Sequence, residues 1–260
     1  MEEFTRAVSR LLSSTDPAEV AVGLEKVRAR MPRAGDDEKR RYVEMISVLF
    51  YIDTLDHPEY IAVVEDAITL VGNVGVVAIP VLMQELEAGD VKAQMAIGQA
   101  LGRMGAEAIA PLLAEYAETC PAPGCRAFTL YALGKIKSAR IIEALPVALE
   151  AAGADDQELR DSATRALGKF AESIPAGQIA PDALGALVER LRENLADGSP
   201  AIRAKAVRSL GKLAKHGHLS AGQCEQLAAM LKRALGEDEH YEWDRAYVVR
   251  KEAREALQYV

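Results

Sequence analysis

The sequence predicts an all-α fold, a right-handed α-solenoid (α-α superhelix) of about seven helix pairs, and three observations support this prediction. Half of the 260 residues are apolar, but only 5% are aromatic, and Ala, Leu, Val and Ile supply most of the apolar side chains. Small and straight-chain residues of this kind favour closely packed helices over sheets. A short phrase recurs along the chain, and the apolar positions around it follow helical spacing.

The recurring phrase is Ala-Leu-Gly or a close variant, followed in its clear copies by a basic and then a hydrophobic residue. Successive glycines are 30, 32, 34 and 43 residues apart, which is the period of a helix pair. A glycine near the end of a helix costs about 1 kcal/mol relative to alanine, so its recurrence predicts that the backbone there approaches a neighbouring helix closely. The glycines are Gly72, Gly102, Gly134, Gly168 and Gly211.

Helix-start signals place the pairs in chain order. Asp16 and Asp56 are each followed by a proline within two residues and by a glutamate three residues on, which predicts N-caps. Ser199 is predicted as an N-cap followed by a first-turn proline, Pro200, and Ser220 with Gln223 predicts a capping box. The pairs are predicted at residues 2–30, 36–72, 74–104, 106–136, 138–171, 180–214 and 219–259.

Three prolines occur early in the first helices of these pairs. Pro80 and Pro111 can lie in a first turn, where the missing N–H has no helical partner. Pro146 comes eight residues after the predicted cap Ser138, so we expect it to bend that helix.

The repeat resembles the HEAT family, in particular the short HEAT-like repeats of phycobilisome-lyase type, whose second helix reads roughly Asp-x-x-Val-Arg-x-x-Ala-x-x-Ala-Leu-Gly. Asp156 and Arg160 occupy the acidic and basic positions, whereas Gln94 departs from the pattern. The resemblance implies a single HEAT-like domain over 1–260, with clear repeats at 73–214 and divergent capping repeats at 1–72 and 215–260. It also implies that the repeated arginines pair with loop aspartates of the same or an adjacent repeat. These arginines are Arg126, Arg160, Arg203 and Arg250.

Charge is unevenly distributed along the chain. The net charge of −8 argues against nucleic-acid binding, for which a basic surface is expected. Residues 1–130 contain 12 Lys/Arg and 20 Asp/Glu, whereas residues 131–260 contain 19 of each. No basic residue occurs at 42–91, but nine acidic residues do, so this stretch is itself a candidate interaction surface. They are Glu44, Asp53, Asp56, Glu59, Glu65, Asp66, Glu85, Glu87 and Asp90.

No motif of an enzyme, a metal site or a cofactor site emerges from the sequence. The four histidines lie outside HExxH patterns and outside the repeated His-Glu pairs that identify the HEAT-like di-iron deoxyhypusine hydroxylases. His216 and His218 could chelate a metal, but no third ligand is near in sequence, and a turn after the sixth repeat is the simpler interpretation. A phosphate-binding glycine loop is also missing, so we predict a non-catalytic protein without cofactors.

The second helix of each pair presents residues on the side opposite the core, at positions −7, −3 and +1 from the repeat glycine. In solenoids of the resembled type these helices line the concave face, so we predict that this face binds a partner protein through an acidic segment of the partner. The predicted contact residues are Met95, Gln99, Phe128, Tyr131, Arg165, Lys169, Arg208 and Lys212. The alternative is that Phe128 and Tyr131 fill space between helices and that the basic side chains are ordinary solvated surface.

These features predict an interaction scaffold or adaptor, with an accessory or chaperone-like subunit of a bilin lyase as the alternative and nucleic-acid binding as a less favoured one. The N-terminus is charged and there is no run of about 18 uncharged apolar residues, so we expect no membrane association. Three cysteines form neither an even set nor a CxxC pattern, which favours free thiols and a cytoplasmic location. The sequence leaves the partner's identity and the oligomeric state open.

Overall fold

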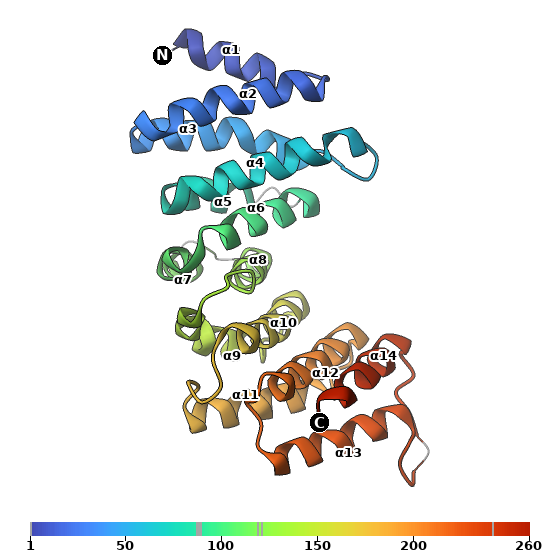
Figure 1. The fold of residues 1–260 in the computed structure, drawn as a ribbon. Helices are drawn as coiled ribbons and strands as arrows, with labels where there is room; N and C mark the ends of the chain where they lie inside the picture. Colours follow the sequence, from blue (N-terminus) through green and yellow to red (C-terminus); the bar gives the residue numbers. More distant parts are fainter. Residues whose placement is uncertain (1, 87–89, 119, 121, 241) are drawn as a thin grey trace. The chain divides into compact units, whose positions relative to one another are not determined.

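The computed structural model describes residues 2–86, 90–118, 120, 122–240 and 242–260. Glu87, one of the acidic residues noted above, lies outside these ranges. The described residues form α-helices, short 3₁₀-helices and loops, and they include no β-strand (Figure 1). The chain divides into two compact units, Met1–Pro121 and Ala122–Val260. The predicted continuity of one domain over 1–260 stays a prediction, and each unit is described by itself.

Unit 1 contains seven α-helices in its described residues. They are α1 (Glu2–Leu12), α2 (Pro17–Arg30), α3 (Asp36–Ser47), α4 (Ile61–Val74), α5 (Ile79–Leu86), α6 (Val91–Arg103) and α7 (Ile109–Glu118). Its 3₁₀-helices are η1 (Met31–Arg33), η2 (Val48–Tyr51), η3 (Pro58–Tyr60), η4 (Gly75–Ala78) and η5 (Gly105–Ala108). Helices α2, α4 and α6 contact one another in succession, as do α1, α3, α5 and α7. The two resulting layers bury Leu24, Ile46, Ile68, Leu82 and Ile97 between them.

Unit 2 repeats this arrangement. Its α-helices are α8 (Pro123–Leu133), α9 (Leu145–Ala151), α10 (Gln157–Ser173), α11 (Pro181–Asn194), α12 (Pro200–Lys215), α13 (Ala221–Leu235) and α14 (Tyr247–Ala256), with η6 (Ala139–Ala144) and η7 (Leu257–Tyr259). Helices α8, α10, α12 and α14 contact one another in succession. Their inner faces bury Leu133, Leu167, Phe170, Leu210 and Leu213. The predicted all-α solenoid of helix pairs is confirmed, and its seven pairs begin and end within a few residues of the predicted positions.

Gly168 and Gly211 allow the close helix contacts predicted for the repeat glycines, whereas a Cβ at Gly134 would meet its nearest atoms at 3.4–3.5 Å, an ordinary contact distance. A Cβ atom at Gly168 of α10 would lie 2.3 Å from Oγ and 2.8 Å from Cα of Ser209 on α12. At Gly211 of α12 it would lie 2.8 Å from Cβ of Ala256 on α14. Because Cβ atoms do not approach other atoms this closely, the distance between adjacent second helices in unit 2 requires glycine at both positions.

Most predicted helix starts are confirmed, and one is wrong. The Asp16 side chain accepts a hydrogen bond from the Ala18 N–H, and Ser220 with Gln223 forms the predicted capping box. Ser199 is the N-cap of α12, although its side chain makes no cap hydrogen bond. Asp56 caps no helix: η3 begins after His57, and α4 follows after Tyr60. A proline at the first position of η3 starts a tight turn before α4, which displaces the cap from Asp56.

Pro146 does not bend a helix, contrary to the prediction. The segment after Ser138 is the 3₁₀-helix η6, and α9 begins at Leu145, so Pro146 lies in the first turn of a new helix. The α-helical hydrogen-bond ladder cannot pass through a proline, because proline lacks the N–H and its ring clashes with the preceding turn. Pro80 and Pro111 lie in the first turns of α5 and α7, as predicted, and each of these helices also follows a 3₁₀-helix.

One segment of unit 1, Pro58–Leu86, has the length and hydropathy of a possible membrane span, with a mean hydropathy of 1.8 over its most apolar stretch. Of that stretch, 56% is buried within the protein. The segment is interrupted at Gly75, whose φ of 77° ends α4 and begins η4. These properties are those of a core element made of two packed helices, and length and composition alone are weak evidence for a membrane-spanning helix.

The cysteines correct another expectation. Cys120 and Cys125 are disulfide-bonded, and the free thiol among the described residues is Cys224. Disulfides are typical of oxidising compartments, so the cysteines do not support the expected cytoplasmic location.

Candidate partner-binding surface

The eight predicted contact residues are distributed over both units. Met95 and Gln99 lie on α6 in unit 1, and the other six lie in unit 2 on α8, α10 and α12. The −3 and +1 positions are at least partly exposed in these helices. The −7 position is not always exposed, since Ala127 and Ala204 are buried where adjacent second helices touch.

Tyr131 on α8 is contacted by two basic side chains and one aromatic side chain. The Lys135 Nζ atom is 4.9 Å from the centroid of the Tyr131 ring, and Cζ of Arg165 on α10 is 5.1 Å from it. Phe128 meets the same ring edge-to-face, with the centroids 6.4 Å apart. In the part of the chain that the structure describes, neither Lys135 nor Arg165 has a carboxylate partner. Two cations therefore hold the aromatic ring by cation–π contacts and keep their hydrogen-bond donors available.

A small cavity of about 60 Å³ opens beside Tyr131. It is lined by four basic side chains and one acidic side chain: Lys135, Arg165, Lys169, Lys205 and Asp161. Asp161 pairs with Lys205, but its second oxygen, Oδ1, is buried without a hydrogen-bond partner. The cavity has room for a carboxylate or a few water molecules, and it combines excess positive charge with one unsatisfied acceptor.

Two of the predicted basic residues are already engaged inside the protein. Lys169 and Lys212 bind the same carboxylate, Glu172, with distances of 3.1 and 2.9 Å from their Nζ atoms to its oxygens. Lys137 binds it as well, at 3.1 Å. Lys169 and Lys212 are therefore engaged with Glu172 inside unit 2, and their role in partner binding stays a prediction.

These contacts shift the pKa values of both partners. Burial opposes ionisation of Glu172, but its hydrogen bonds with Lys212, Lys137 and Lys169 outweigh burial and lower its pKa to about 2. Burial lowers the pKa of Lys212 to about 8, although Glu172 favours the charged form. The cluster is thus an internal cross-link between α10 and α12 with more positive than negative charge.

Arg208 has a structural partner that the sequence did not reveal. Its Nε donates to Oε2 of Glu252 on α14 at 2.7 Å, and the Glu252 side chain is almost completely buried, with 2% of the residue exposed. Half of the Arg208 side chain remains exposed beside this ion pair, and its predicted role in partner binding stays a prediction. The two residues are 44 positions apart, so no local signal connects them.

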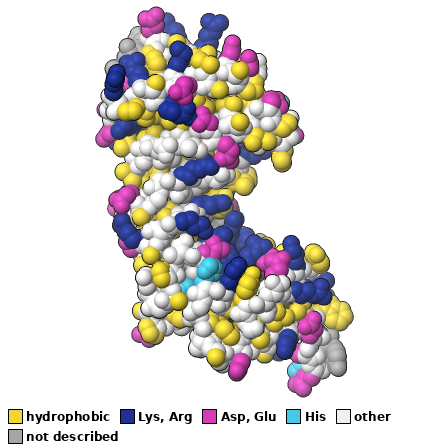
Figure 2. Space-filling view, in the orientation of Figure 1, with side chains coloured by type: hydrophobic (Ala, Val, Ile, Leu, Met, Phe, Trp, Pro, Cys, Tyr) yellow, Lys and Arg dark blue, Asp and Glu magenta, His cyan; other side chains and the backbone are white. Residues whose placement is uncertain are grey.

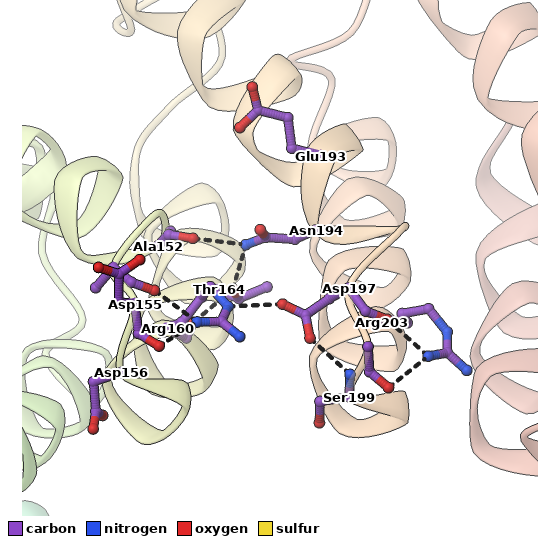
Figure 3. A network of polar contacts seen from close by, with 12 residues as sticks. Ala152, Asp155, Asp156, Arg160, Thr164, Glu193, Asn194, Asp197, Ser199 and Arg203 are labelled. Atoms are coloured by element: carbon purple, nitrogen blue, oxygen red, sulfur yellow. Dashed lines mark hydrogen bonds and ion pairs between the residues drawn. The ribbon is translucent and has the colours of Figure 1, made fainter.

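The repeated arginines form a ladder along unit 2, as the resemblance implied (Figure 3). Arg160 donates through Nε to Asp197 at 2.7 Å and through Nη1 to the carbonyls of Ala154 and Asp155 at 2.6 and 3.0 Å. Arg203 repeats this pattern one pair later, with Asp244 at 2.7 Å and the carbonyls of Asp197 and Gly198 at 2.8 and 3.2 Å. Each arginine therefore ties the loop before its own helix to the next such loop.

The last repeat closes the ladder. Arg250 donates to the carbonyls of Asp244 and Arg245 at 2.6 and 3.0 Å. Hydrogen bonding to Arg203 lowers the pKa of Asp244, with burial acting in the opposite direction. The predicted pairing with loop aspartates is confirmed for Arg160 and Arg203, whereas Arg250 is held by backbone carbonyls, so all three arginines have structural partners.

The space-filling view shows Lys and Arg side chains gathered over α8, α10 and α12 (Figure 2). Many of these basic side chains form ion pairs within unit 2. Lys135 and Arg165, beside Tyr131, have no carboxylate partner among the described residues and can bind a partner's carboxylate. Arg165 and Tyr131, both predicted, are brought together by the structure. Lys205 was missed, because its position on the helix gave no reason to place it beside α10.

A contact within the protein explains the position of His218. His218 is buried, and its Nε2–H donates to the Ala171 carbonyl at 2.9 Å, which fits the predicted turn after the sixth repeat. Within the described residues, no group of three or more His, Cys, Asp or Glu side chains is arranged to hold a metal ion.

The described helices stack in pairs within each unit, and in unit 2 an arginine–aspartate ladder joins successive loops. Residues 79–168 match the family model of HEAT repeats, so the resemblance is confirmed for this segment. No curated protein matches the chain in sequence.

Solved structures share the fold. The complex of CpcE and CpcF of phycocyanin lyase from Nostoc sp. PCC7120 contains a chain with 25% identity and a TM-score of 0.54, and the match covers 70% of this chain and 98% of that one. An engineered protein has 19% identity and a TM-score of 0.52, with 99% and 96% covered. The karyopherin Kap121p, bound to the extreme C-terminus of the phosphatase Cdc14p, has 15% identity and a TM-score of 0.60, with 98% of this chain but 29% of that one covered.

Proposed function

We propose that this chain is a non-catalytic scaffold or adaptor, and that its unit 2 binds an acidic segment of a partner protein. The observation that carries the proposal is the Tyr131 ring held between Lys135 and Arg165, two cations without carboxylate partners in the described residues. The HEAT-type fold provides the scaffold, and the similarity to a chain of the CpcE–CpcF complex, itself a protein–protein complex, supports a role in protein binding.

The basic side chains that line the cavity favour a partner segment that carries a carboxylate. An Asp or Glu side chain of the partner can accept hydrogen bonds from Lys135 and Arg165, and such charge-assisted bonds are stronger than neutral ones. An apolar residue next to the acidic one can pack on Phe128 and Tyr131, since aromatic and arginine side chains contribute most of the energy in interfaces.

The test begins with capture of the partner from the native cell, followed by titration calorimetry with the purified partner. Tyr131→Ala should weaken binding about 30-fold, or roughly 2 kcal/mol, because it removes the central anchor. Arg165→Glu should slow association and reduce its dependence on salt. Lys232→Glu, an equal charge reversal on an exposed residue of α13, is the matched control and should change affinity less than threefold. Unchanged affinity in both surface variants, with a folded protein, rejects the proposed site.

A second candidate function follows from the similarity to a chain of the phycocyanin lyase complex. In this alternative, the chain is an accessory or chaperone-like subunit for a bilin chromophore. Mixing the purified protein with a bilin and recording the visible spectrum distinguishes the two: a shifted and intensified absorbance band favours the accessory role, and an unchanged spectrum removes it.

A further inference from the structure

Unit 1 exposes apolar side chains around a groove that the proposed function does not use. The groove has a volume of about 280 Å³ and lies between the loop before α4, helix α4 and helix α6. Its floor and walls are apolar, with Phe50, Ile52, Val64 and Ile68 among the lining residues. Leu55, in the loop that projects before α4 (Figure 1), is 91% exposed.

Exposure of this kind needs an explanation. Ile61 and Met95 also line the groove and are 50% and 48% exposed, so three large apolar side chains face solvent around one opening. Single exposed apolar residues are common, but a contiguous group with a polar rim marks an interaction site. A volume of about 280 Å³ is at the lower end of ligand pockets, roughly 300–1,000 Å³, and is sufficient for one or two bulky apolar side chains.

The rim of the groove is acidic. Asp53 and Glu65 line it, Asp56 follows in the loop after Asp53, and Glu59 lies in η3. In the described residues of 42–91 no basic residue offsets these carboxylates, as the sequence itself dictates. The cations that do reach the rim come from α6: Lys92 pairs with Asp53, and Arg103 pairs with Glu65 at 2.7 Å.

These two ion pairs show how the rim receives a cation. The Lys92 side chain is 53% exposed and approaches Asp53 from the solvent side, so it can leave this carboxylate for water. An incoming lysine or arginine can therefore take the same place, while an apolar side chain next to it enters the groove.

We propose that this groove is a second docking surface, which binds a basic segment of a partner protein that carries a bulky apolar side chain. Its selectivity is opposite to that of the Tyr131 surface, so the chain would hold two segments of opposite charge. This proposal rests on unit 1 alone and does not depend on the proposed function of unit 2.

The test uses labelled twelve-residue synthetic peptides and fluorescence anisotropy with the full chain. The probe contains two leucines and four arginines among serines and glycines. One comparison peptide has glutamate in place of arginine, and another has serine in place of leucine. We expect the probe to bind at least tenfold more tightly than either comparison peptide, since it alone satisfies both the apolar walls and the acidic rim.

Protein variants locate the binding. Leu55→Ser and Met95→Gln should each weaken probe binding at least threefold. Val22→Ser, an exposed apolar residue elsewhere in unit 1, is the matched control and should have no effect. Lys92→Met should strengthen probe binding about threefold, because it frees Asp53; a purely structural role of Lys92 does not predict a gain.

The proposal is overturned if the glutamate peptide binds as well as the arginine peptide, or if Leu55→Ser and Met95→Gln bind the probe like the unaltered chain. Sedimentation velocity at increasing protein concentration addresses a different occupant. Self-association that Leu55→Ser abolishes would assign the groove to a second copy of this chain and reject the proposed partner. Because the Tyr131 variants retain the groove, their failure to bind an acidic partner leaves this test unaffected.

Discussion

Units 1 and 2 are built from the same helix pair but use their charged residues differently. In unit 2, arginines and lysines connect one pair to the next through Asp197, Asp244, Glu172 and Glu252, all partly or fully buried. In unit 1, the ion pairs between α4 and its neighbours involve carboxylates that are far more exposed, such as Glu65 and Asp66. The difference shows that a helix-pair array can be joined either by polar ladders or mainly by apolar contacts.

The same difference explains where binding surfaces remain. Most lysines and arginines of unit 2 form ion pairs or hydrogen bonds within the unit. Beside Tyr131, Lys135 and Arg165 remain without a carboxylate partner among the described residues. Unit 1 has few cations to consume, so its carboxylates and its apolar groove both face solvent. Four predictions, in decreasing order of expected effect, examine this comparison.

Reversal of a cross-linking charge should affect unit 2 much more than unit 1. Arg208→Glu places a second carboxylate against the buried Glu252 and should lower the free energy of unfolding by about 3 kcal/mol or more. Arg103→Glu faces the exposed Glu65 and should cost less than about 1 kcal/mol. Chemical denaturation gives the two values, and hydrogen exchange shows which unit opens. Equal losses for the two variants would remove the distinction between the units.

Introduction of a methyl group at a repeat glycine should also discriminate between the units. Gly168→Ala brings Cβ against the Ser209 backbone and should destabilise by about 2–3 kcal/mol. Gly72→Ala meets Cβ of Arg103 at 2.9 Å and the Ala100 carbonyl oxygen at 3.2 Å, so its overlaps, and with them its cost, should be smaller than those at Gly168. Gly185→Ala is the control: it has open space in the exposed part of α11 and should stabilise by up to about 1 kcal/mol. Thermal unfolding of the three variants supplies the ranking.

Acid should weaken unit 2 through Glu172. The pKa of this carboxyl is lowered from 4.5 to about 2 in the folded protein, so its contribution is complete above pH 4.5 and is lost as the pH falls towards 2. Between pH 5 and pH 2.5, Glu172→Gln should lose less unfolding free energy than the unaltered chain, by an amount on the order of 2 kcal/mol. Parallel pH profiles for the two proteins would contradict the assignment of the lysine cluster as a cross-link.

The smallest effect concerns helix caps. Asp16→Ala removes the hydrogen bond to the Ala18 N–H and should cost about 1 kcal/mol in unit 1. Ser199→Ala should cost only a few tenths of 1 kcal/mol, because the Ser199 side chain makes no cap hydrogen bond in unit 2. Denaturation midpoints of the two variants measure the difference, and a Ser199→Ala cost equal to that of Asp16→Ala would refute it.

Local features of the chain were sufficient to predict the helix pairs. Apolar spacing, the Ser220–Gln223 capping box and the repeat glycines act within one or two turns of a helix, so they can be recognised without knowledge of distant contacts. The errors at Asp56 and Pro146 were also local, and both came from 3₁₀-turns that compete with a direct helix start.

The candidate site was predicted only in part. The position of Tyr131 and Arg165 on one face followed from helical periodicity, and their proximity is confirmed. The pairing of Arg208 with Glu252 and of Lys205 with Asp161 joins residues 44 positions apart, and helical periodicity does not rank such pairs. The exposure of Leu55 was equally inaccessible, because nothing in its surroundings in the sequence distinguishes it from a core leucine.

The sequence by itself therefore determined the class of fold and the helix pairs, which depend on repeated short-range patterns, and the uneven charge, which depends on composition; the arginine ladder was implied by the resemblance to HEAT-like repeats. Only the tertiary structure decided which lysines and arginines pair with internal carboxylates and which remain unpaired beside Tyr131. It also decided which apolar side chains stay exposed at the groove of unit 1. The physical reason is that the strength of an ion pair and the burial of an apolar side chain depend on neighbours brought close by packing, and a residue's place in the repeat does not specify those neighbours.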